Sequence, residues 1–406
     1  MQIGTPPSVF PQSYLNATAQ MDIVIMGFYE GWTDSNGVVN NFSGFTKQLK
    51  ALNPNIQIGQ YTILQEAYQV PNYNVNITTE LTNQNWWLKD ASGAGVQDTV
   101  GSNTWVVDIT NWTTPDANGN RYPQWYANYE YNLYFQNTPN FTIWYADNTF
   151  SQPWTATSGD WMLNGATQSN TDPTIMNAYQ QGHVAEWKKI RSLSSNLIMA
   201  NPGMNLSTPN YQGQLDASFM EAITGLSWSV DYGQSGGWAL AMNYYQTTLS
   251  NLRNPSQWFA VYAANYDSNT LTQMGTATYY SFFRYAYASS LMQNGCFAFS
   301  GTTYQSPPIF DEYSLKLGQA TSTAQAWING AWTGNSNWAS SGVWSRQFTN
   351  GMAMVNSTTA PVTVNVGSGY WHLNGTQDLI TNNGASIAES ITIPARDGII
   401  LKNSAP

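Results

Sequence analysis

The feature that most constrains the fold is a series of short apolar runs, each of strand length, separated by stretches with helical periodicity. Eight such runs fall within about 300 residues, at 23–28, 56–63, 105–107, 141–146, 197–200, 217–220, 258–263 and 296–299. Apolar residues recur with helical spacing between most of them, at 45–52, 125–135, 175–193, 240–252 and 279–292. Near-continuous apolar strands alternating with helices are typical of a parallel sheet covered on both faces, and eight units favour a (β/α)8 barrel over an open sheet.

The pattern changes after a last predicted helical segment at 313–327. Residues 329–341 are rich in Gly, Asn and Ser, which is typical of a linker. Beyond the linker come strand-sized alternations and Asn-Gly turns, at 352–355, 362–366, 391–393 and 399–401. We therefore expect a barrel domain over residues 1–338 and a small antiparallel, sandwich-like β domain over 339–406. A structural cap is the simplest role for the small domain, and sugar binding is the alternative.

The chain is poor in charge, with 13 Lys and Arg, 23 Asp and Glu and a formal net charge of −10 over 406 residues. The charged share is 9%, where soluble domains average about 25%. Nucleic acid is disfavoured as a partner because counterion release needs clustered Lys and Arg. A surface of Asn, Gln, Ser and Thr changes little between neutral and acidic pH, so we expect an acid-stable, extracellular protein. The alternative is a surface protein with a merely neutral polar exterior.

The sequence offers few metal ligands, since Cys296, His183 and His372 are its only Cys and His residues. A structural zinc site, an iron–sulfur cluster or a Cys–His dyad would lack ligands. We expect no metal and no cofactor, and any catalysis to depend on carboxyl groups, Tyr or Lys. We also expect no membrane span, because no run of about 18 apolar residues occurs.

The candidate catalytic residues follow from the barrel, whose active sites lie at the C-terminal ends of the strands. Among the first polar residues after each run, which also include Glu66, two acids stand out: Asp147 after 141–146 and Glu221 after 217–220. Their strands lie two positions apart on the ring, where neighbouring strands are about 4.8 Å apart. The two carboxyl groups can then lie about 5 to 9 Å apart, which covers retaining and most inverting glycoside hydrolysis.

The neighbours of the two acids suggest different roles. Asp147 precedes Asn148 in a segment rich in Tyr and Trp donors, which suits an ionised nucleophile. Glu221 follows Phe219 and Met220, which suits a proton donor whose pKa is raised by desolvation. The alternative for each is an acid that caps the next helix or binds loop amides.

Aromatic residues form 14% of the chain, and many lie near the expected strand ends. Sugar rings stack their apolar faces on aromatic planes, and their hydroxyls bind Asn, Gln and Tyr. The predicted substrate-binding residues are Tyr29, Glu30, Tyr61, Asp108, Trp144, Asn148, Asn201 and Tyr262. For any single aromatic residue, core packing is the simpler explanation. Asp108 is equally suited to orienting a loop, and His183 is expected to be a surface or packing residue.

Several segments together resemble the hypothetical glycosyl hydrolase family fifteen, barrels related to the endo-α-1,4-polygalactosaminidases. The similar segments are Asp22-Ile23-Val24-Ile25, Gln60-Tyr61-Thr62, Trp105-Val106-Val107-Asp108-Ile109-Thr110, Asp147-Asn148, Leu215-Asp216-Ala217-Ser218-Phe219-Met220-Glu221, and the tail from Arg346-Gln347-Phe348 to Arg396-Asp397-Gly398.

The resemblance covers nearly the whole chain and implies a barrel that cleaves a polysaccharide or oligosaccharide, with Asp147 as nucleophile and Glu221 as acid/base. It also favours a retaining mechanism. The long segment 149–170 departs from the family pattern and would reshape the cleft. The alternative from another functional class is a non-catalytic, extracellular carbohydrate-binding protein.

Overall fold

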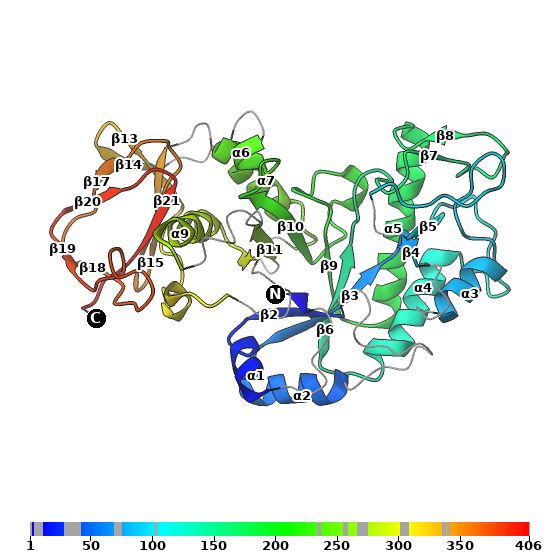
Figure 1. Ribbon diagram of the computed structural model, residues 1–406, viewed down its shortest axis with the longest axis horizontal. Helices are drawn as coiled ribbons and strands as arrows, with labels where there is room; N and C mark the ends of the chain where they lie inside the picture. Colours follow the sequence, from blue (N-terminus) through cyan, green and yellow to red (C-terminus); the bar gives the residue numbers. More distant parts are fainter. Residues whose placement is uncertain are drawn as a thin grey trace. The chain divides into compact units, whose positions relative to one another are not determined.

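A computed structural model of the chain describes residues 2–3, 11–27, 42–68, 75–100, 104–233, 237–254, 259–265, 275–300, 308–334, 338 and 342–405 (Figure 1). The chain divides into two compact units, each described here by itself. Unit 1 comprises Met1–Ser218 and Asn251–Trp258, and unit 2 comprises Phe219–Ser250 and Phe259–Pro406.

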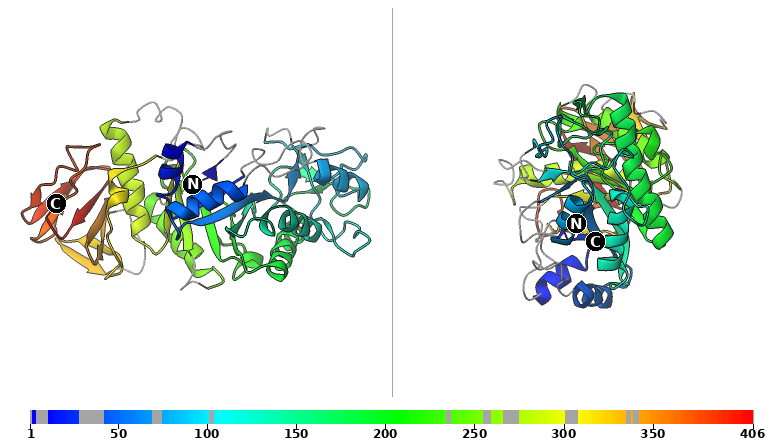
Figure 2. Two further views of the ribbon diagram at one scale, coloured as in Figure 1. Left: turned by 90° about the horizontal axis from the view of Figure 1, so that it is seen from below. Right: turned by 90° about the vertical axis from the view of Figure 1, so that its right-hand side faces the viewer.

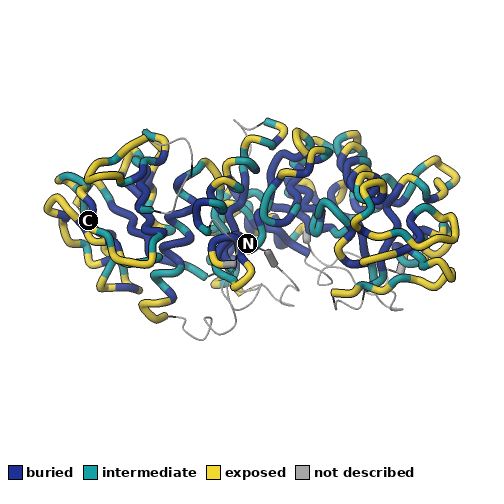
Figure 3. Tube along the Cα trace, turned by 90° about the horizontal axis from the view of Figure 1, so that it is seen from above, coloured by how far each residue is buried: buried dark blue, intermediate teal, exposed yellow. Residues whose placement is uncertain are grey.

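Unit 1 is built on parallel strands that pair in the order β1 (Gln2–Ile3), β2 (Ile23–Met26), β3 (Gln57–Ile63), β6 (Phe141–Asp147) and β9 (Leu197–Ala200). The first residues of β10 (Ala217–Thr224) pair with β9 and continue the sheet. The central strands are buried almost throughout, as their near-continuous apolar sequences predict. Buried residues (dark blue) run through the interior of the unit in Figure 3, and exposed ones gather in the turns.

The helices of unit 1 are α1 (Gln12–Thr18), α2 (Phe42–Leu52), α3 (Val75–Asn83), α4 (Tyr122–Glu130) with its π-helical continuation η1 (Tyr131–Phe135), and α5 (Pro173–Leu193). Helix α5 begins where Asp172 accepts a hydrogen bond from the backbone N–H of Thr174 at 2.7 Å, with Pro173 at the first helical position. Gly182 lets this helix approach residue 109, because a Cβ atom there would lie 2.3 Å from the carbonyl oxygen of Ile109.

The third apolar run of the sequence is not a barrel strand, so that prediction is wrong. β3 pairs directly with β6, while β5 (Trp105–Val106) pairs antiparallel with β4 (Glu66–Ala67). Residues 64–140 thus form an insertion between two neighbouring barrel strands. The insertion has an apolar core that includes residues of its helices α3 and α4 and buries Val107, while Val106 is buried in a second apolar cluster. The core comprises Leu64, Ile77, Leu81, Trp86, Trp87, Val107, Ile109, Tyr122, Tyr126 and Tyr179.

Unit 2 contains the second half of β10, the parallel pair β11 (Phe259–Ala264) and β12 (Cys296–Phe299), and helices α6 (Val230–Gly233), α7 (Gly237–Ser250) and α9 (Ala277–Leu291). An antiparallel sheet follows in the order β14 (Ala331–Gly334), β13 (Gln325–Ile328), β15 (Val343–Phe348), β16 (Gly351–Asn356), β21 (Asp397–Lys402), β18 (Tyr370–His372) and β19 (Ser386–Ile387). Strands β17 (Val362–Asn365) and β20 (Ser390–Ile393) pair separately.

The fold class predicted from the sequence is confirmed: parallel strands with helices form a half-barrel of the (β/α)8 class, and an antiparallel β domain follows. Two details differ. The predicted helix at 313–327 is wrong, because its residues form a 3₁₀ turn, η3 (Asp311–Ser314), and most of β13. The predicted linker 329–341 contains β14, so two strands of the antiparallel sheet precede residue 339. The division into domains at 338 and 339 stays a prediction.

Helix α9 packs on β21 through a buried ion cluster within unit 2 (Figures 1 and 2). The guanidinium of Arg284, 3% exposed, donates to both carboxyl oxygens of Asp397, at 3.0 and 2.9 Å, and to Asp378. Gly398 makes this approach possible, because a Cβ atom there would lie 2.3 Å from the carbonyl oxygen of Arg284. Among the described residues, no helix is long and apolar enough to cross a bilayer.

We expect the substitution Arg284→Gln to lower the free energy of unfolding by about 3 to 5 kcal/mol, because it leaves two buried carboxylates without their cation. Urea titration followed by tryptophan fluorescence measures the change. Arg253→Gln is the matched control, since Arg253 is 45% exposed and its partner Asp216 keeps Arg191. We expect that control to cost about 1 kcal/mol or less, and an equal loss in both variants would contradict the buried cluster's role.

Candidate functional site

Asp147, the last residue of β6, is held by uncharged hydrogen-bond donors from neighbouring strands. The hydroxyl of Tyr61, on β3, donates to its Oδ2 at 2.7 Å. The side-chain amide of Asn201, just after β9, donates to its Oδ1 at 2.8 Å, and the hydroxyl of Tyr145 adds a longer bond of 3.4 Å to the same oxygen. Both carboxyl oxygens are therefore fixed at the C-terminal edge of the parallel sheet.

The donor end of Asn201 is directed at Asp147 by the bonds of its other atoms. Its Oδ1 accepts a hydrogen bond from the backbone N–H of Gly203 at 3.0 Å, and its Nδ2 donates to Asp147. Its backbone N–H donates to Ala146, and its carbonyl accepts from Thr149, both at 2.9 Å. These bonds tie the ends of β6 and β9 together, so the amide and the carboxyl keep a constant separation.

The chain turns sharply directly after Asp147. Asn148 has a φ of 53°, in the left-handed region that Asn tolerates better than most residues. Its backbone N–H also donates to the carboxyl of Asp147. The sequence predicts that Asn148 belongs to the site, and in the structure the backbone of Asn148 contacts Asp147.

Two opposing effects act on the pKa of Asp147. Desolvation by burial raises it above its usual value, and the hydrogen bonds from Tyr61, Asn201, Asn148 and Tyr145 lower it. Desolvation is the larger effect, because none of these donors carries a charge. The hydrogen bonds thus hold the carboxyl group in one orientation, while its pKa stays above its usual value.

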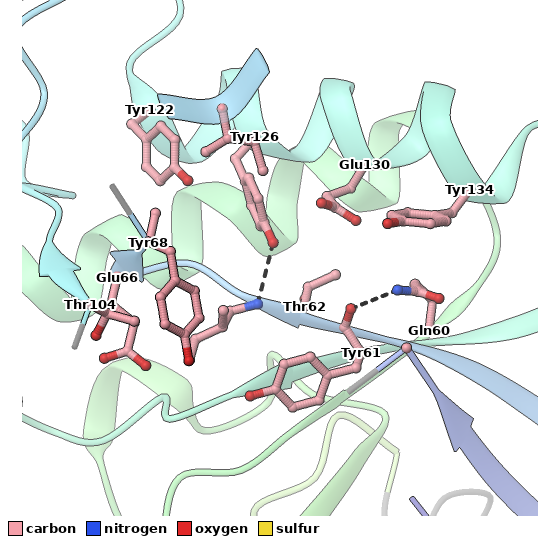
Figure 4. Close-up of a pocket in the computed structure, with 14 residues that line it drawn as sticks. Gln60, Tyr61, Thr62, Glu66, Tyr68, Thr104, Tyr122, Tyr126, Glu130 and Tyr134 are labelled. Carbon is pink, nitrogen blue, oxygen red and sulfur yellow. Dashed lines mark hydrogen bonds between the residues drawn. The ribbon is translucent and has the colours of Figure 1, made fainter. Parts of the chain in front are cut away.

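A small cavity lies beside β3 and α4, lined in part by Tyr61, Glu66 and Glu130 (Figure 4). Its volume of about 50 Å³ is far below the roughly 300 Å³ of pockets that enclose small ligands. The cavity can admit a few water molecules but not a sugar ring. The remaining lining residues are Gly27, Gln60, Thr62, Ile63, Ala67, Tyr68, Ile77, Thr104, Tyr122, Tyr126 and Tyr134.

Glu66 lines this cavity, and the charge of Asp147 is one of the effects on its pKa. It is 3% exposed, and its Oε2 has no hydrogen-bond partner among the residues that the structure describes. Desolvation raises its pKa to about 7, with further increases from the carboxylates of Asp98 and Asp147 and a decrease from a hydrogen bond to Thr104. Glu66 is therefore largely protonated at mildly acidic pH.

Glu130 and Glu186 are also buried acids of unit 1, but they lie on helices α4 and α5. Burial raises the pKa of Glu130 to about 8 and that of Glu186 well above its usual value, the latter with a contribution from Glu130. Within the described part of the chain, neither oxygen of Glu186 has a hydrogen-bond partner. Burial therefore favours the protonated form of both acids.

Other predicted site residues of unit 1 have structural contacts. Trp144 is fully buried, its indole N–H donates to Thr62 at 2.9 Å, and its ring stacks on Phe135 at 4.6 Å. Asp108 is also fully buried, and its Oδ1 accepts hydrogen bonds from the backbone and hydroxyl of Thr110 at 2.9 and 2.7 Å. Burial raises the pKa of Asp108 to about 7. These contacts match the packing and loop-orienting alternatives given above.

The predicted residues of unit 2 are Glu221 and Tyr262. β10 extends to Thr224, so Glu221 lies within the strand and not at its end, as a half-buried side chain. Tyr262 is fully buried, and its hydroxyl pairs with Thr224 Oγ1 at 2.5 Å. Tyr29 and Glu30 lie outside the described residues. The catalytic and sugar-binding roles of these residues stay predictions.

The structure adds Tyr145 and Glu66 to the residues around Asp147. Tyr145 precedes Asp147 by two positions, so both side chains project to one face of β6, and its ring stacks on Tyr61 at 5.7 Å. The spacing of two residues between Tyr145 and Asp147 is therefore a signal in the sequence from which Tyr145 could have been predicted. Among the described residues, no group of three or more His, Cys, Asp and Glu side chains is arranged to hold a metal ion.

Comparison with known proteins shows the fold. No protein-family model matches the chain, and neither does any curated protein sequence. Isomaltulose synthase from Klebsiella sp. LX3 is similar in structure over 99% of this chain and 98% of its own, with a TM-score of 0.51 and 10% identity. The alpha-glucosyl transfer enzyme XgtA is similar over 96% and 93%, with a TM-score of 0.52 and 9% identity.

These two similarities support a barrel followed by a β domain over the full chain. They do not extend to family fifteen or to polygalactosaminidases, so the finer family resemblance given by the sequence is not supported.

The buried acids predict how stability depends on pH. Glu66, Asp108 and Glu130 have folded pKa values of about 7, 7 and 8, above the value of about 4 in an unfolded chain. The folded state then binds more protons, and stability falls as pH rises from about 4 to 8. His183, fully buried against Tyr179 and Trp187, acts oppositely below about pH 6.5, because burial lowers its pKa to about 3.

We therefore expect the melting temperature to fall between pH 6.5 and pH 8, measured by circular dichroism. Glu130→Gln should reduce that fall, because an amide does not ionise, and Glu389→Gln, at an exposed position, should leave it unchanged. A melting temperature that rises over this interval, or equal slopes in both variants, would refute the assignment.

Proposed function

We propose that the protein is a glycoside hydrolase that cleaves a polysaccharide or oligosaccharide with a pair of carboxyl groups, one of them Asp147. The observation that supports this most is the set of uncharged donors around Asp147 at the C-terminal edge of a barrel sheet, where barrel enzymes have their active sites. The two similar folds belong to an isomaltulose synthase and an alpha-glucosyl transfer enzyme, which is consistent with a sugar substrate.

In the proposed reaction, the carboxylate of Asp147 attacks the anomeric carbon while a second carboxyl group protonates the leaving oxygen. The second group then removes a proton from a water molecule, whose oxygen attacks the anomeric carbon and releases Asp147, so two displacements together retain the configuration. Tyr61 and Asn201 hold the attacking carboxylate in one orientation, so less conformational freedom is lost when it reaches the geometry of attack. The sequence assigns the second carboxyl to Glu221.

Backbone conformation gives further support at both sequence-predicted acids. Asn148 directly follows Asp147 with a φ of 53°, and Ala222 directly follows Glu221 with a φ of 46°. The left-handed region costs an L-residue such as alanine about 1 to 2 kcal/mol, and such strain gathers at functional sites. Each acid is thus followed by an unfavourable conformation that redirects the chain.

We also propose that the protein acts outside the cell in an acidic habitat. Two observations support this proposal: the sequence has few charged residues, and its buried acids have raised pKa values. The stability of the folded chain at low pH therefore does not depend on ionised carboxylates.

The proposal predicts sugar release from at least one member of a broad panel of polysaccharides at about pH 5. Asp147→Asn should abolish turnover while leaving glycan binding, because the amide keeps the shape but is not a nucleophile. Tyr61→Phe should lower kcat by about 10- to 100-fold, since it removes one donor from the carboxylate.

Tyr370→Phe is the control for loss of a hydroxyl, because Tyr370 bonds to Gln347 in the β domain at 3.0 Å. Reducing-sugar assays and binding by calorimetry give the two readouts. Binding without turnover in the wild type would favour the non-catalytic carbohydrate-binding protein, and full turnover in Asp147→Asn would exclude Asp147 from the reaction.

A further inference from the structure

We infer that Trp154 is a binding platform for a sugar residue of the glycan beyond the two that share the cleaved bond. This inference rests on the proposed function and deepens it, because a platform separate from Asp147 makes a chain of several sugars the preferred substrate over a mono- or disaccharide. It follows from the exposure of the indole, from the rigid segment that holds it, and from the contacts that join this segment to Asp147.

Exposed aromatic side chains are few, and their positions follow a pattern. The sequence has 18 Trp, 25 Tyr and 15 Phe residues, and among the residues that the structure describes the exposed ones are Trp154, Trp228 and Tyr232. Each lies in a segment that directly follows a strand of the parallel sheet, Trp154 after β6 and the other two after β10. Barrel proteins build their substrate sites from such segments. Trp154, 36% exposed, belongs to unit 1, which also holds Asp147.

The backbone is fixed on both sides of the Trp154 indole. The carbonyl oxygen of Pro153 accepts a hydrogen bond from Asn170 Nδ2 at 2.7 Å, and that of Thr155 accepts one from the backbone N–H of Thr99 at 2.9 Å. Pro153 and Thr155 are themselves buried, so the indole is an exposed side chain between two buried neighbours. A ring that is fixed before it binds loses little conformational entropy when it stacks on a ligand.

The start of the same segment is fixed as well. The carbonyl oxygen of Phe150 accepts a hydrogen bond from the hydroxyl of Tyr211 at 3.0 Å, and that of Ser151 accepts one from Gln180 Nε2 at 2.6 Å. Gln180 belongs to helix α5. The segment is therefore held by neighbouring elements of unit 1 along its course from Asp147 to Trp154.

A chain of contacts within unit 1 joins Trp154 to Asp147. The indole packs against the ring of Phe150, with the two centroids 5.1 Å apart. Phe150 lies against Gly203, where an added Cβ atom would lie 3.0 Å from the ring. The backbone N–H of Gly203 donates to Asn201, whose amide donates to Asp147 at 2.8 Å. These contacts run through three intermediate residues, which suits a sugar further along the glycan and not the one that Asp147 attacks.

The composition of residues 149–170 suits a neutral glycan as the occupant. Asp160 is the only charged residue of this segment, and Ser, Thr, Asn, Gln and Gly make up most of the rest. The carboxyl of Asp160 is buried and accepts hydrogen bonds from the backbone N–H groups of Asn164 and Gly165, at 2.9 and 2.8 Å. The segment therefore offers an aromatic plane among hydroxyl and amide groups, and sugar rings stack their apolar faces on such planes.

The test measures how activity and binding depend on the length of the glycan in Trp154→Ala, Trp154→Phe and Leu52→Ala. The probes are soluble starch, dextran, xylan and chitosan, with a series of oligosaccharides and the 4-nitrophenyl monosaccharide of each. Calorimetric binding to Asp147→Asn, with and without Trp154→Ala, needs no turnover. Leu52→Ala is the matched control, because Leu52 is 46% exposed at the end of α2, just before the start of β3 and so away from the carboxyl edge of the sheet.

We expect Trp154→Ala to lower kcat/KM on the polysaccharide by about 10- to 100-fold and to weaken its binding to Asp147→Asn by a similar factor, because the apolar face of a sugar loses its cover. The nitrophenyl monosaccharide does not reach the platform, so its kcat/KM should stay within about twofold of wild type. Trp154→Phe keeps an aromatic ring and should lose less than about fivefold on the polysaccharide. Leu52→Ala should behave as wild type on every probe.

The inference is overturned if Trp154→Ala keeps wild-type turnover and affinity on the polysaccharide. It is also overturned if its loss is the same for every chain length, which would indicate a structural role, or if Leu52→Ala shows the same loss. A failure of the proposed function is distinguishable, because the wild type then binds a glycan without cleaving it, and the binding measurements still test Trp154. A wild type that neither binds nor cleaves any probe overturns both proposals.

Discussion

A carboxyl group buried away from any cation must either stay protonated or be stabilised by neutral hydrogen-bond donors, and this constraint governs the site. Among the described residues, the ion pairs join Asp216 to Arg191 and Arg253, and Arg284 to Asp378 and Asp397. Glu66, Asp108 and Glu130 are buried without such a partner, and burial raises the pKa of each to about 7 or 8. A chain with so few Lys and Arg residues can bury acids mainly in their neutral form.

The same scarcity of charge shapes the surroundings of Asp147 and Glu66. No guanidinium or ammonium group is paired with either acid in the described part of the chain, and burial raises the pKa of both. Asp147 lies where β3, β6 and β9 end together and collects donors from all of them. Glu66 lies one step into the insertion, where a hydroxyl and two carboxylates surround it.

Much of the barrel could be predicted from the sequence, because strands buried on both faces have continuous apolar runs. Asp147 and Asn201 were predicted from the rule that parallel strands end at one edge, and Tyr61 was predicted as an aromatic residue near a strand end. The run at 105–107 was misassigned because three apolar residues do not specify their pairing partner, which is β4. Glu221 was placed at a strand end because polarity interrupts the run there, although β10 continues through a half-buried position. Glu66 follows a predicted strand, but only the fold brings Asp98 and Thr104 beside it.

The insertion between β3 and β6 separates the groups that orient Asp147 from two of the groups that affect the pKa of Glu66. The residues that orient Asp147 belong to the barrel strands and their ends, whereas Asp98 and Thr104, which affect the pKa of Glu66, belong to the insertion. Changes in the insertion can therefore shift the pKa of Glu66 without disturbing the hydrogen bonds of Asp147. A variant with an altered pKa at Glu66 is therefore best sought among substitutions in this segment.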